Sequence, residues 1–373
     1  MSKTEDLWWV VDVAKASPDR SPDPPVTPTS LEALRLCPLS RCYARSTAGR
    51  YPQRVVPSAR IGTAVHSTIE KIAGVATQAD TAAACARTAL EIFRAKVEWE
   101  KTQSFQNPRE RNLTWPEEKL FDAENSIIRI ARLAFTARSA SVPIGHSHHE
   151  FECTLKSKDG MIAGIADHLE LFDGGARITD YKTSLSLDDL DKHRHQLLLY
   201  AFLYFDSHGE WPSALTLDYV LMRKRVPVEV DREIAIKLAD EARTIAGSLP
   251  YMLDVEKLAR PGPACKYCSY RPWCQSYWRA VQYFDIPERF SGIEGVVKTR
   301  LNEGSKVLLS VEGQDSLFDV RGDSESVEQL GEVHPGMTIR IVDASVYGVA
   351  SRPTVELTAR AELFAMSEVG HEQ

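Results

Sequence analysis

The hydrophobic positions in the first half of the chain repeat with the period of an α-helix. Apolar residues recur at this spacing at Ile61, Val65, Ile69 and Ile72. They predict a helix over residues 59–75, with His66 beside its apolar stripe. Thr29 or Ser30 is a good N-cap for a shorter helix at about residues 31–36. Further helices are predicted over residues 81–101, 117–140, 188–206 and 232–258.

Alternating apolar and polar positions follow these first helices from residue 149 onward. The strands that they predict cover residues 149–155, 161–172, 176–181, 215–222 and 227–230. A Gly174-Gly175 turn joins the second and third of these strands into a β-hairpin. Strands and helices in this order predict an α/β core whose sheet carries the hairpin centrally.

The last part of the chain has a different pattern, with short strands separated by turn residues. These strands are predicted over residues 292–297, 306–311, 316–320, 338–346 and 354–361. Five strands in roughly eighty residues suggest a small closed β-barrel that is OB-like. The predicted division is therefore an extended N-terminal segment over 1–29, an α/β domain over 30–286 and a barrel over 287–373.

The composition limits the kinds of protein that this chain can be. Its 373 residues are 43% hydrophobic and 26% charged, which is typical of a soluble globular protein with two or three domains. No run approaches the roughly eighteen apolar residues of a membrane span, so we expect a cytoplasmic protein with no membrane partner. From Arg289 onward there are 8 Lys/Arg and 14 Asp/Glu. A nucleic-acid surface would therefore be a local basic patch in the earlier part.

The predicted hairpin carries charged residues that could form a catalytic site. Asp180 and Lys182 lie on one face of the second strand and Tyr181 on the other, while Asp167 on the first strand can face the charged pair. Carboxylate oxygens suit a hard cation such as Mg²⁺ or Mn²⁺. A lysine beside that ion can orient a water or stabilise charge on a phosphate. On this pattern alone, ordinary solvated hairpin charges are the interpretation that we favour.

Cysteine spacing gives the strongest metal-ligand signal. Cys265, Cys268 and Cys274 form a C-x2-C-x5-C pattern after a Pro/Gly loop, and the best fourth ligand is Cys37, with Cys42 as its rival. Seven cysteines without a secretory signal argue against a disulfide framework. The bound group is either structural zinc or a [4Fe–4S] cluster. Aromatic residues would surround it at Tyr267, Tyr270, Trp273 and Trp278.

Together these motifs resemble the RecB-like branch of the PD-(D/E)XK nuclease superfamily. More narrowly, they are similar to its iron–sulfur members, the AddB nuclease domain and the CRISPR-adaptation nucleases. The matching motifs, in chain order, are Thr27-Pro28-Thr29-Ser30-Leu31 with Cys37-Pro38, Gly62-Thr63-Ala64-Val65-His66, Gly164-Ile165-Ala166-Asp167, Asp180-Tyr181-Lys182, Gln196-Leu197-Leu198-Leu199-Tyr200, and the three trailing cysteines. Six motifs in the right order over residues 27–274 are hard to obtain by chance. Asp180 stands where many relatives carry Glu.

The resemblance implies a role for each matched residue. The implied ligands of a Mg²⁺ or Mn²⁺ ion are His66, Asp167, Asp180 and the Tyr181 carbonyl. Lys182 would position the attacking water. Gln196 and Tyr200, one helical turn apart, would border the active site and touch the substrate. On pattern alone, His66 and Tyr200 could equally be structural. Glu152 is an additional acidic candidate.

The function that the resemblance implies is a metal-dependent nuclease acting on DNA. It would be an exonuclease on single-stranded ends, with a PD-(D/E)XK restriction-endonuclease-like core, a helical N-terminal part and a structural [4Fe–4S] cluster. The implied cluster ligands are Cys37, Cys265, Cys268 and Cys274. The alternative is a non-catalytic DNA-binding or scaffolding subunit. The C-terminal barrel is acidic and poor in aromatic residues, so we expect it to contact a protein partner or dock within the chain.

Three groups of basic residues have two interpretations each. The polar region over residues 101–115, with Arg109 and Arg111, is either a solvated connection, which we favour, or an exposed loop near a nucleic-acid strand. Residues 223–225 either guide the substrate backbone or are solvated surface charges. The same alternatives apply to the arginines near the first helix, Arg41, Arg45, Arg50 and Arg54.

Overall fold

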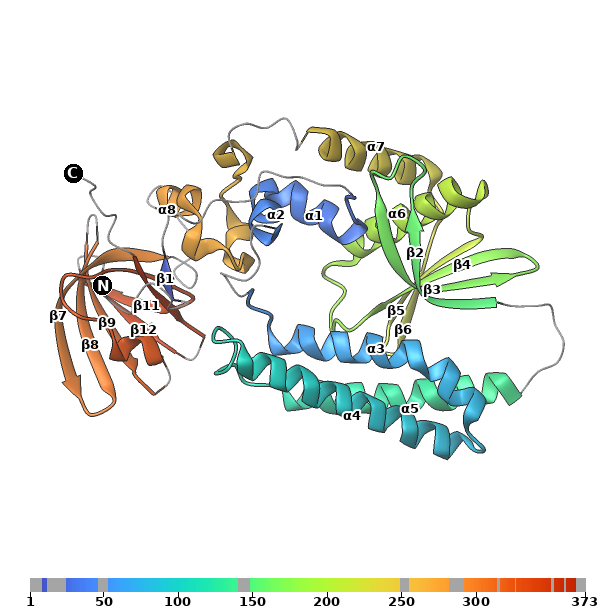
Figure 1. Cartoon of the computed structure of the whole chain (residues 1–373), viewed down its shortest axis with the longest axis horizontal. Helices are drawn as coiled ribbons and strands as arrows, with labels where there is room; N and C mark the ends of the chain where they lie inside the picture. The colour runs from blue at the N-terminus through green and yellow to red at the C-terminus, as the bar shows by residue number, and fades with distance from the viewer. Residues whose placement is uncertain are drawn as a thin grey trace.

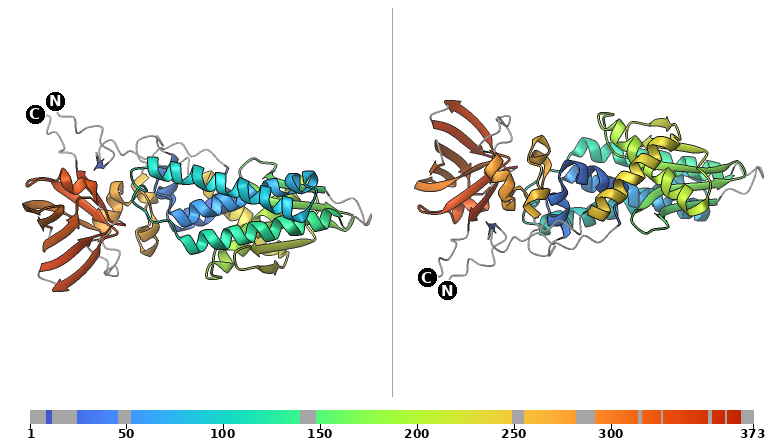
Figure 2. Two further views of the ribbon diagram at one scale, coloured as in Figure 1. Left: turned by 90° about the horizontal axis from the view of Figure 1, so that it is seen from below. Right: turned by 90° about the horizontal axis from the view of Figure 1, so that it is seen from above.

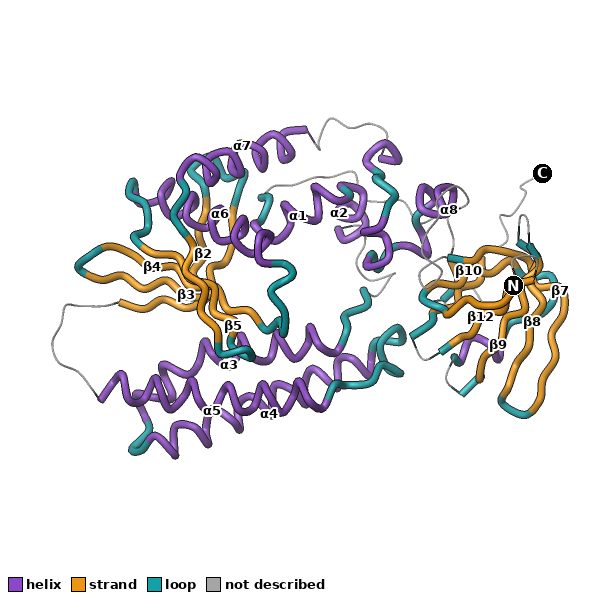
Figure 3. Tube along the Cα trace, turned by 180° about the vertical axis from the view of Figure 1, so that it is seen from behind, coloured by secondary structure: helices purple, strands orange, loops and turns teal. Residues whose placement is uncertain are grey.

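A computed structural model of the chain places a β-sheet at each end of an elongated molecule, with helices around and between the sheets (Figure 1, Figure 3). The structure describes residues 9–11, 25–45, 53–139, 148–248, 255–281, 292–313, 316–325, 327–349, 352–358 and 360–366. Among these residues, no helix has both the length and the apolar character needed to cross a membrane.

The first sheet holds the predicted hairpin at its centre, in the strand order β2-β3-β4-β5-β6. Its strands are β2 (His148–Lys156), β3 (Ala163–Phe172), β4 (Gly175–Lys182), β5 (Ala214–Tyr219) and β6 (Lys224–Val228). Only β4 and β5 run parallel; the other neighbours are antiparallel. The hairpin turn is Asp173-Gly174, one residue earlier than predicted, because Phe172 pairs with Gly175. Gly175 can take this position because its φ of 121° is open to glycine.

Helices cover both faces of this sheet and make a three-layer α/β core (Figure 2). One layer contains α3 (Pro57–Gln78), α4 (Ala82–Gln106) and α5 (Glu117–Ser139), and the other contains α1 (Pro28–Leu36), α6 (Leu190–His208) and α7 (Arg232–Ser248). The predicted apolar stripe of α3 is buried at Ile61, Val65, Ile69 and Ile72. The mixed α/β core that the sequence predicts is therefore present, with its helical N-terminal part.

The first helix, α1, starts earlier than predicted because a different residue caps it. Thr27, not Thr29 or Ser30, is the N-cap of α1. The Thr27 hydroxyl accepts from the Ser30 N–H at 3.0 Å, and the Ser30 hydroxyl accepts from the Thr27 N–H at 2.7 Å. This reciprocal capping box begins the helix at Pro28, a first position where a missing N–H costs nothing.

The C-terminal strands form a curled half-barrel sheet among the described residues, so the barrel is found in part, and its closure and OB-like type stay predictions. The strand order is β1-β13-β10-β7-β8-β9-β12-β11, which leaves β1 and β11 as edges among the described residues. The strands are β1 (Val10–Val11), β7 (Ile293–Glu303), β8 (Lys306–Glu312), β9 (Leu317–Asp323), β10 (Thr338–Val342), β11 (Ser345–Val349), β12 (Arg352–Leu357) and β13 (Glu362–Met366). The predicted strand 338–346 is two strands because Asp343 adopts a left-handed φ of 60° between them.

A single hydrophobic core joins this C-terminal sheet to the segment that precedes it. Trp273 is 1% exposed, and its ring meets the Phe364 ring edge-on at 5.5 Å between centroids. Trp9 is buried in the same core, next to β1, which pairs in parallel with β13. The division at residues 286 and 287 stays a prediction, but the apolar contacts continue across it.

Arg109 corrects the sequence-based interpretation of residues 101–115. We expected a solvated connection or an exposed nucleic-acid contact, yet the Arg109 side chain is 1% exposed. Its Nε lies 2.7 Å from Glu362 Oε1 on β13. The sequence could not indicate this burial because the partner carboxylate is 253 residues away.

Candidate active site

The acidic residues of the hairpin lie where β3 and β4 separate. Their backbone pairing ends at His168 and Thr179. Beyond this pair, the Tyr181 N–H donates to Asp167 Oδ2 at 2.7 Å. This contact replaces a strand hydrogen bond by a side-chain one and fixes the Asp167 carboxylate against β4.

Asp180 is the most deeply buried acid of the site, at 3% exposure. Lys182 Nζ lies 2.7 Å from Asp180 Oδ2, at angles that do not make a hydrogen bond, so this oxygen has no hydrogen-bond donor. Burial raises the pKa of Asp180 to about 6, the charge of Lys182 opposes the rise, and Asp167 adds to it. The buried Asp180 carboxylate is thus paired with the Lys182 ammonium group and, with Asp167, offers oxygen ligands to a bound cation.

His66 reaches these carboxylates from α3. Its Nδ1 lies 3.5 Å from Asp167 Oδ1. Burial alone would lower the pKa of His66, but contact with the Asp167 carboxylate outweighs burial and raises it. Gly62, one turn earlier, allows the helix to come this close, because a Cβ there would lie only 2.7 Å from Thr183 Oγ1.

Gln196 and Tyr200 approach the site from α6 on the same side of the sheet. Gln196 Oε1 accepts from Lys182 Nζ at 2.9 Å, and its Nε2 donates to Thr29 Oγ1 at 3.2 Å. Tyr200 is 5% exposed and belongs to the core, as the structural interpretation expected. Its pKa is raised first by burial and then by the charge of Asp180, so its ring also lies near the site.

Gly164 is the position at which α1 and α6 meet β3. A Cβ there would lie 2.7 Å from Pro28 Cδ and 2.8 Å from Tyr200 Cε1. The glycine of the Gly164–Asp167 motif is therefore needed for packing, three residues before the carboxylate that the motif supplies.

Two further acidic residues lie close to this site. Glu152 on β2 has a left-handed φ of 50°, an uncommon conformation for a non-glycine residue. Its pKa is raised by burial and then by the charges of Asp167 and Glu70. Sequence reasoning included Glu152 only as an additional candidate and missed Glu70. The available signal for Glu70 was its position one helical turn after His66.

These side chains have the chemistry of a Mg²⁺ or Mn²⁺ site. Carboxylate oxygens come from separate strands, and the Asp180 carboxylate is buried beside the Lys182 ammonium group. Among the described residues, however, no group of three or more His, Cys, Asp or Glu side chains is already arranged to hold a metal ion. The donor set fits the cation, and ion binding would have to draw the donors together.

The predicted cluster cysteines line one cavity of about 290 Å³. Cys37 is the C-cap of α1, and the other three belong to residues 263–274, which we call the cysteine loop. Burial raises the pKa of the Cys268 thiol to about 11. Cys42 is buried in the core beside the cavity and does not line it. Tyr267 and Tyr270 line the cavity as expected, whereas Trp273 and Trp278 pack into the core shared with the C-terminal sheet.

Comparison with known families agrees with this arrangement. Residues 25–275 match the PD-(D/E)XK nuclease superfamily. The chain belongs to this superfamily. The matched span contains the candidate active site and the whole cysteine loop, and it ends before the C-terminal sheet. The three-layer core is therefore a domain of the PD-(D/E)XK nuclease superfamily.

Two other comparisons add little to the PD-(D/E)XK assignment. No curated protein matches the chain. One solved structure with some likeness is the tetrameric p202 HIN2, at 14% identity and a TM-score of 0.18. The match covers 21% of this chain and 41% of that one. A likeness this low carries no argument about fold or function.

Proposed function

We propose that this PD-(D/E)XK protein is a metal-dependent deoxyribonuclease of the RecB-like branch, acting as an exonuclease on single-stranded ends. The supporting observation is the convergence of Asp167, Asp180 and Lys182, from two strands, with His66 from one helix and Gln196 from another. These are the groups that phosphodiester hydrolysis requires: oxygen ligands for a cation, and an ammonium beside them.

Each side chain has a role in the proposed reaction. The ion would be held by Asp167, Asp180, His66 and the Tyr181 carbonyl. When bound, it supplies an activated water and neutralises charge on the phosphate. Lys182 positions that water and stabilises the negative charge that develops on the phosphate. Gln196 accepts from Lys182 Nζ and so fixes the direction of the ammonium group.

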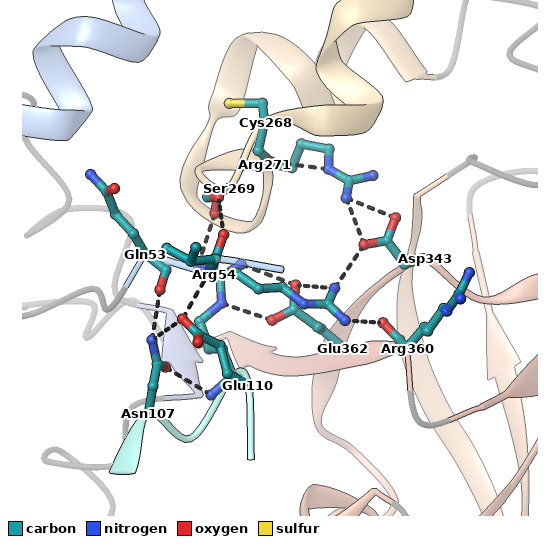
Figure 4. Close-up of polar contacts among 12 residues, drawn as sticks. Gln53, Arg54, Asn107, Glu110, Cys268, Ser269, Arg271, Asp343, Arg360 and Glu362 are labelled. Atoms are coloured by element: carbon teal, nitrogen blue, oxygen red, sulfur yellow. Dashed lines mark hydrogen bonds and ion pairs between the residues drawn. The ribbon is translucent and has the colours of Figure 1, made fainter. Parts of the chain in front are cut away.

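A cluster of positive charge next to the site supports a nucleic-acid substrate. Arg129 on α5 donates to the Val220 carbonyl at 3.1 Å, and the Val220 N–H donates to the Lys182 carbonyl at 3.0 Å. The pKa of Arg129 is lowered by burial and also by the nearby charges of Arg223 and Arg225, against the opposing charge of Asp218, which is paired with Arg225 at 2.8 Å. Repelling cations are stabilised when a phosphate backbone lies over them. Of the other arginines considered for this role, Arg54 is occupied elsewhere (Figure 4), and Arg50 lies outside the described residues.

We further propose that the cysteine cavity holds a structural [4Fe–4S] cluster, with zinc as the alternative. Cys37, Cys265, Cys268 and Cys274 would be its ligands. The supporting observation is that all four thiols line one cavity. Protein purified without oxygen should be brown and absorb near roughly 400 nm. A colourless protein with stoichiometric zinc would show that the alternative is correct.

The nuclease proposal is tested with end-labelled single- and double-stranded DNA in the presence of Mg²⁺ or Mn²⁺. We expect Asp180→Asn and Lys182→Ala each to lower the cleavage rate by about 100-fold or more. The matched control is Glu170→Gln on β3, which removes only a partly exposed ion pair with Arg177 and should leave the rate unchanged.

Two outcomes would contradict this proposal. Equal cleavage by the wild type and the variants would remove the assigned residues from the mechanism. Salt-dependent DNA binding by a wild type that never cleaves would favour a DNA-binding or scaffolding subunit. Products released only from single-stranded ends would support exonuclease action. Products of internal cleavage would contradict it.

A further inference from the structure

A histidine–tyrosine pair lies beside Lys182, on the side of it that is away from Asp167. Tyr219 ends β5 and is in register with Lys182 on the parallel strand β4, so the two side chains point to the same face of the sheet. The strand order β3-β4-β5 puts Asp167 on one side of Lys182 and Tyr219 on the other. His193 on α6 comes one turn before Gln196, which bonds Lys182. The pair is therefore a direct neighbour of the ammonium group.

The hydrogen bond within this pair fixes which ring nitrogen of His193 carries the proton. Tyr219 is fully buried, and its hydroxyl lies 2.9 Å from His193 Nδ1. Within the described part of the chain, Nδ1 is the only hydrogen-bond partner of this hydroxyl, and a buried O–H needs an acceptor. The hydroxyl therefore donates to Nδ1, and the neutral ring carries its proton on Nε2.

The surroundings keep this ring neutral and leave its donor available. Burial lowers the pKa of His193 to about 4, and the charges of Lys182 and Lys192 act in the same direction, against the charge of Asp189. The side chain is half-buried, and its Nε2 makes no hydrogen bond to any described residue. At neutral pH an N–H donor next to an ammonium group is thus open to a ligand that is rich in acceptors.

We propose that His193 binds a second phosphate of the nucleic-acid strand, next to the phosphate that the metal ion and Lys182 would hold. Phosphate oxygens accept hydrogen bonds and carry the negative charge that a nearby ammonium group stabilises. Asp167 on β3 and Tyr219 on β5 are two strand spacings apart, about 10 Å, which is too far for one phosphate group to reach both. This inference rests on the proposed nuclease function and adds a binding position to it.

The test measures the affinity for a fluorescent single-stranded oligonucleotide without divalent metal, and separately the KM and kcat for cleavage. His193→Ala should weaken binding and raise KM by about tenfold each, because a hydrogen bond to a charged group is lost. The kcat should change less than about threefold, since the groups around the ion are untouched. His193→Gln should restore much of the affinity because its amide supplies an N–H donor. Equal affinity and KM for wild type and His193→Ala would overturn the proposal.

The matched control is His208→Ala at the other end of α6. His208 also packs on a tyrosine of the same helix, with 4.2 Å between the centroids of its ring and that of Tyr204. Its Nδ1 lies 3.0 Å from the Tyr204 carbonyl oxygen. It is about 22 Å along the helix from His193, so His208→Ala should bind and cleave like the wild type. Equal weakening by His193→Ala and His208→Ala would mean a general effect on α6 and would overturn the phosphate contact.

A set of modified oligonucleotides identifies the phosphate. Each carries one uncharged methylphosphonate linkage, at a position that moves along the strand from one oligonucleotide to the next. At the linkage next to the cleaved one, the difference in affinity between wild type and His193→Ala should disappear, because the interacting pair is then already broken. A difference that persists at every linkage would overturn the phosphate contact.

Tyr219→Phe tests the positioning of the His193 ring. Without the hydroxyl, Nδ1 loses its donor, so the proton should be shared between the two ring nitrogens. The ¹⁵N NMR shifts of the imidazole should report the Nε2–H form in the wild type and a mixture in the variant. Identical shifts in the two proteins would overturn this role of Tyr219.

These measurements separate this inference from the nuclease proposal. A wild type that binds the oligonucleotide and never cleaves it would contradict the nuclease proposal, while the binding assay would still measure the His193 contact. A wild type that cleaves, with an unchanged KM in His193→Ala, would overturn this inference alone. A wild type that neither binds nor cleaves would overturn both.

Discussion

Gln196 connects three elements of the candidate active site through one side-chain amide. It accepts from Lys182 on β4 and donates to Thr29 on α1. Gln196→Ala removes both contacts without disturbing the helix, because alanine is a better helix former. We expect kcat to fall about tenfold or more, because the ammonium group loses its fixed direction, with little change in Tm. Steady-state kinetics combined with thermal unfolding would check this.

A neighbouring residue on α6 gives the control for Gln196. The Arg194 side chain is 48% exposed and pairs only loosely with Asp191, at 3.7 Å. Arg194→Ala should leave both kcat and Tm unchanged. If the two variants lose the same activity, the contact between Gln196 and Lys182 has no part in the reaction.

At this scale the sequence shows which residues share a face but not what they contact. Alternation along a strand was enough to place Asp180 and Lys182 together, since that period is a property of the backbone. The contact between the Tyr181 N–H and Asp167 could not be predicted, because it depends on where the ladder ends. Glu70 was missed because an exposed acidic residue on a helix cannot be told from an ordinary solvent-facing residue.

At the scale of elements, a motif glycine determines how α1 and α6 pack on β3. Gly164→Ala would place a Cβ 2.7 Å from Pro28 Cδ and 2.8 Å from Tyr200 Cε1. We expect it to lower the free energy of unfolding by about 1–3 kcal/mol, as overpacking does. Gly74→Ala, inside α3 with nothing within 4 Å of its Cβ, should raise it by about 0.5–1 kcal/mol. Urea titrations would measure the change in unfolding free energy for each variant. Changes of the same sign for Gly164→Ala and Gly74→Ala would contradict this account.

Regular elements with a strong period were the easiest to predict, and connections were the hardest. The hairpin and the long helices follow from repeating apolar positions, whose spacing reflects burial on one side. Strands of the C-terminal sheet were predicted, but their full number and order were not, because Asp343 divides one apolar run into two strands and because Val10–Val11 pairs with a strand near the opposite end of the chain. Neither event leaves a periodic signal.

At the scale of the whole molecule, the C-terminal sheet is attached to the nuclease core by both apolar and ionic contacts. Trp273 packs on Phe364, and the neighbouring Arg109 is buried against Glu362. Docking within the chain was one of the two roles expected for this part, and the structure contains such contacts. A protein partner for the sheet stays a proposal. Composition alone could suggest that the C-terminal sheet docks within the chain. It could not indicate which charged residues make the contact.

Glu362 provides the test of this attachment. Glu362→Gln keeps the size of the side chain and leaves Arg109 buried without its counter-charge. We expect the free energy of unfolding at neutral pH to fall by about 3 kcal/mol or more, as when one partner of a buried pair is removed. Asp319→Asn, which breaks an exposed pair with Arg352, should cost about 0–1 kcal/mol.

The pH dependence of the same variant separates a charge effect from a packing effect. Burial alone would raise the pKa of Glu362, but the charge of Arg109 and the hydrogen bonds from it outweigh burial, so the pKa is lowered. Stability from this group is therefore complete above the ordinary glutamate pKa of about 4.3, and it is lost as the pH falls through the lowered value. The difference in unfolding free energy between wild type and Glu362→Gln should shrink over that acid range. A difference that is the same at every pH would mean that shape, and not charge, holds the sheet at this point.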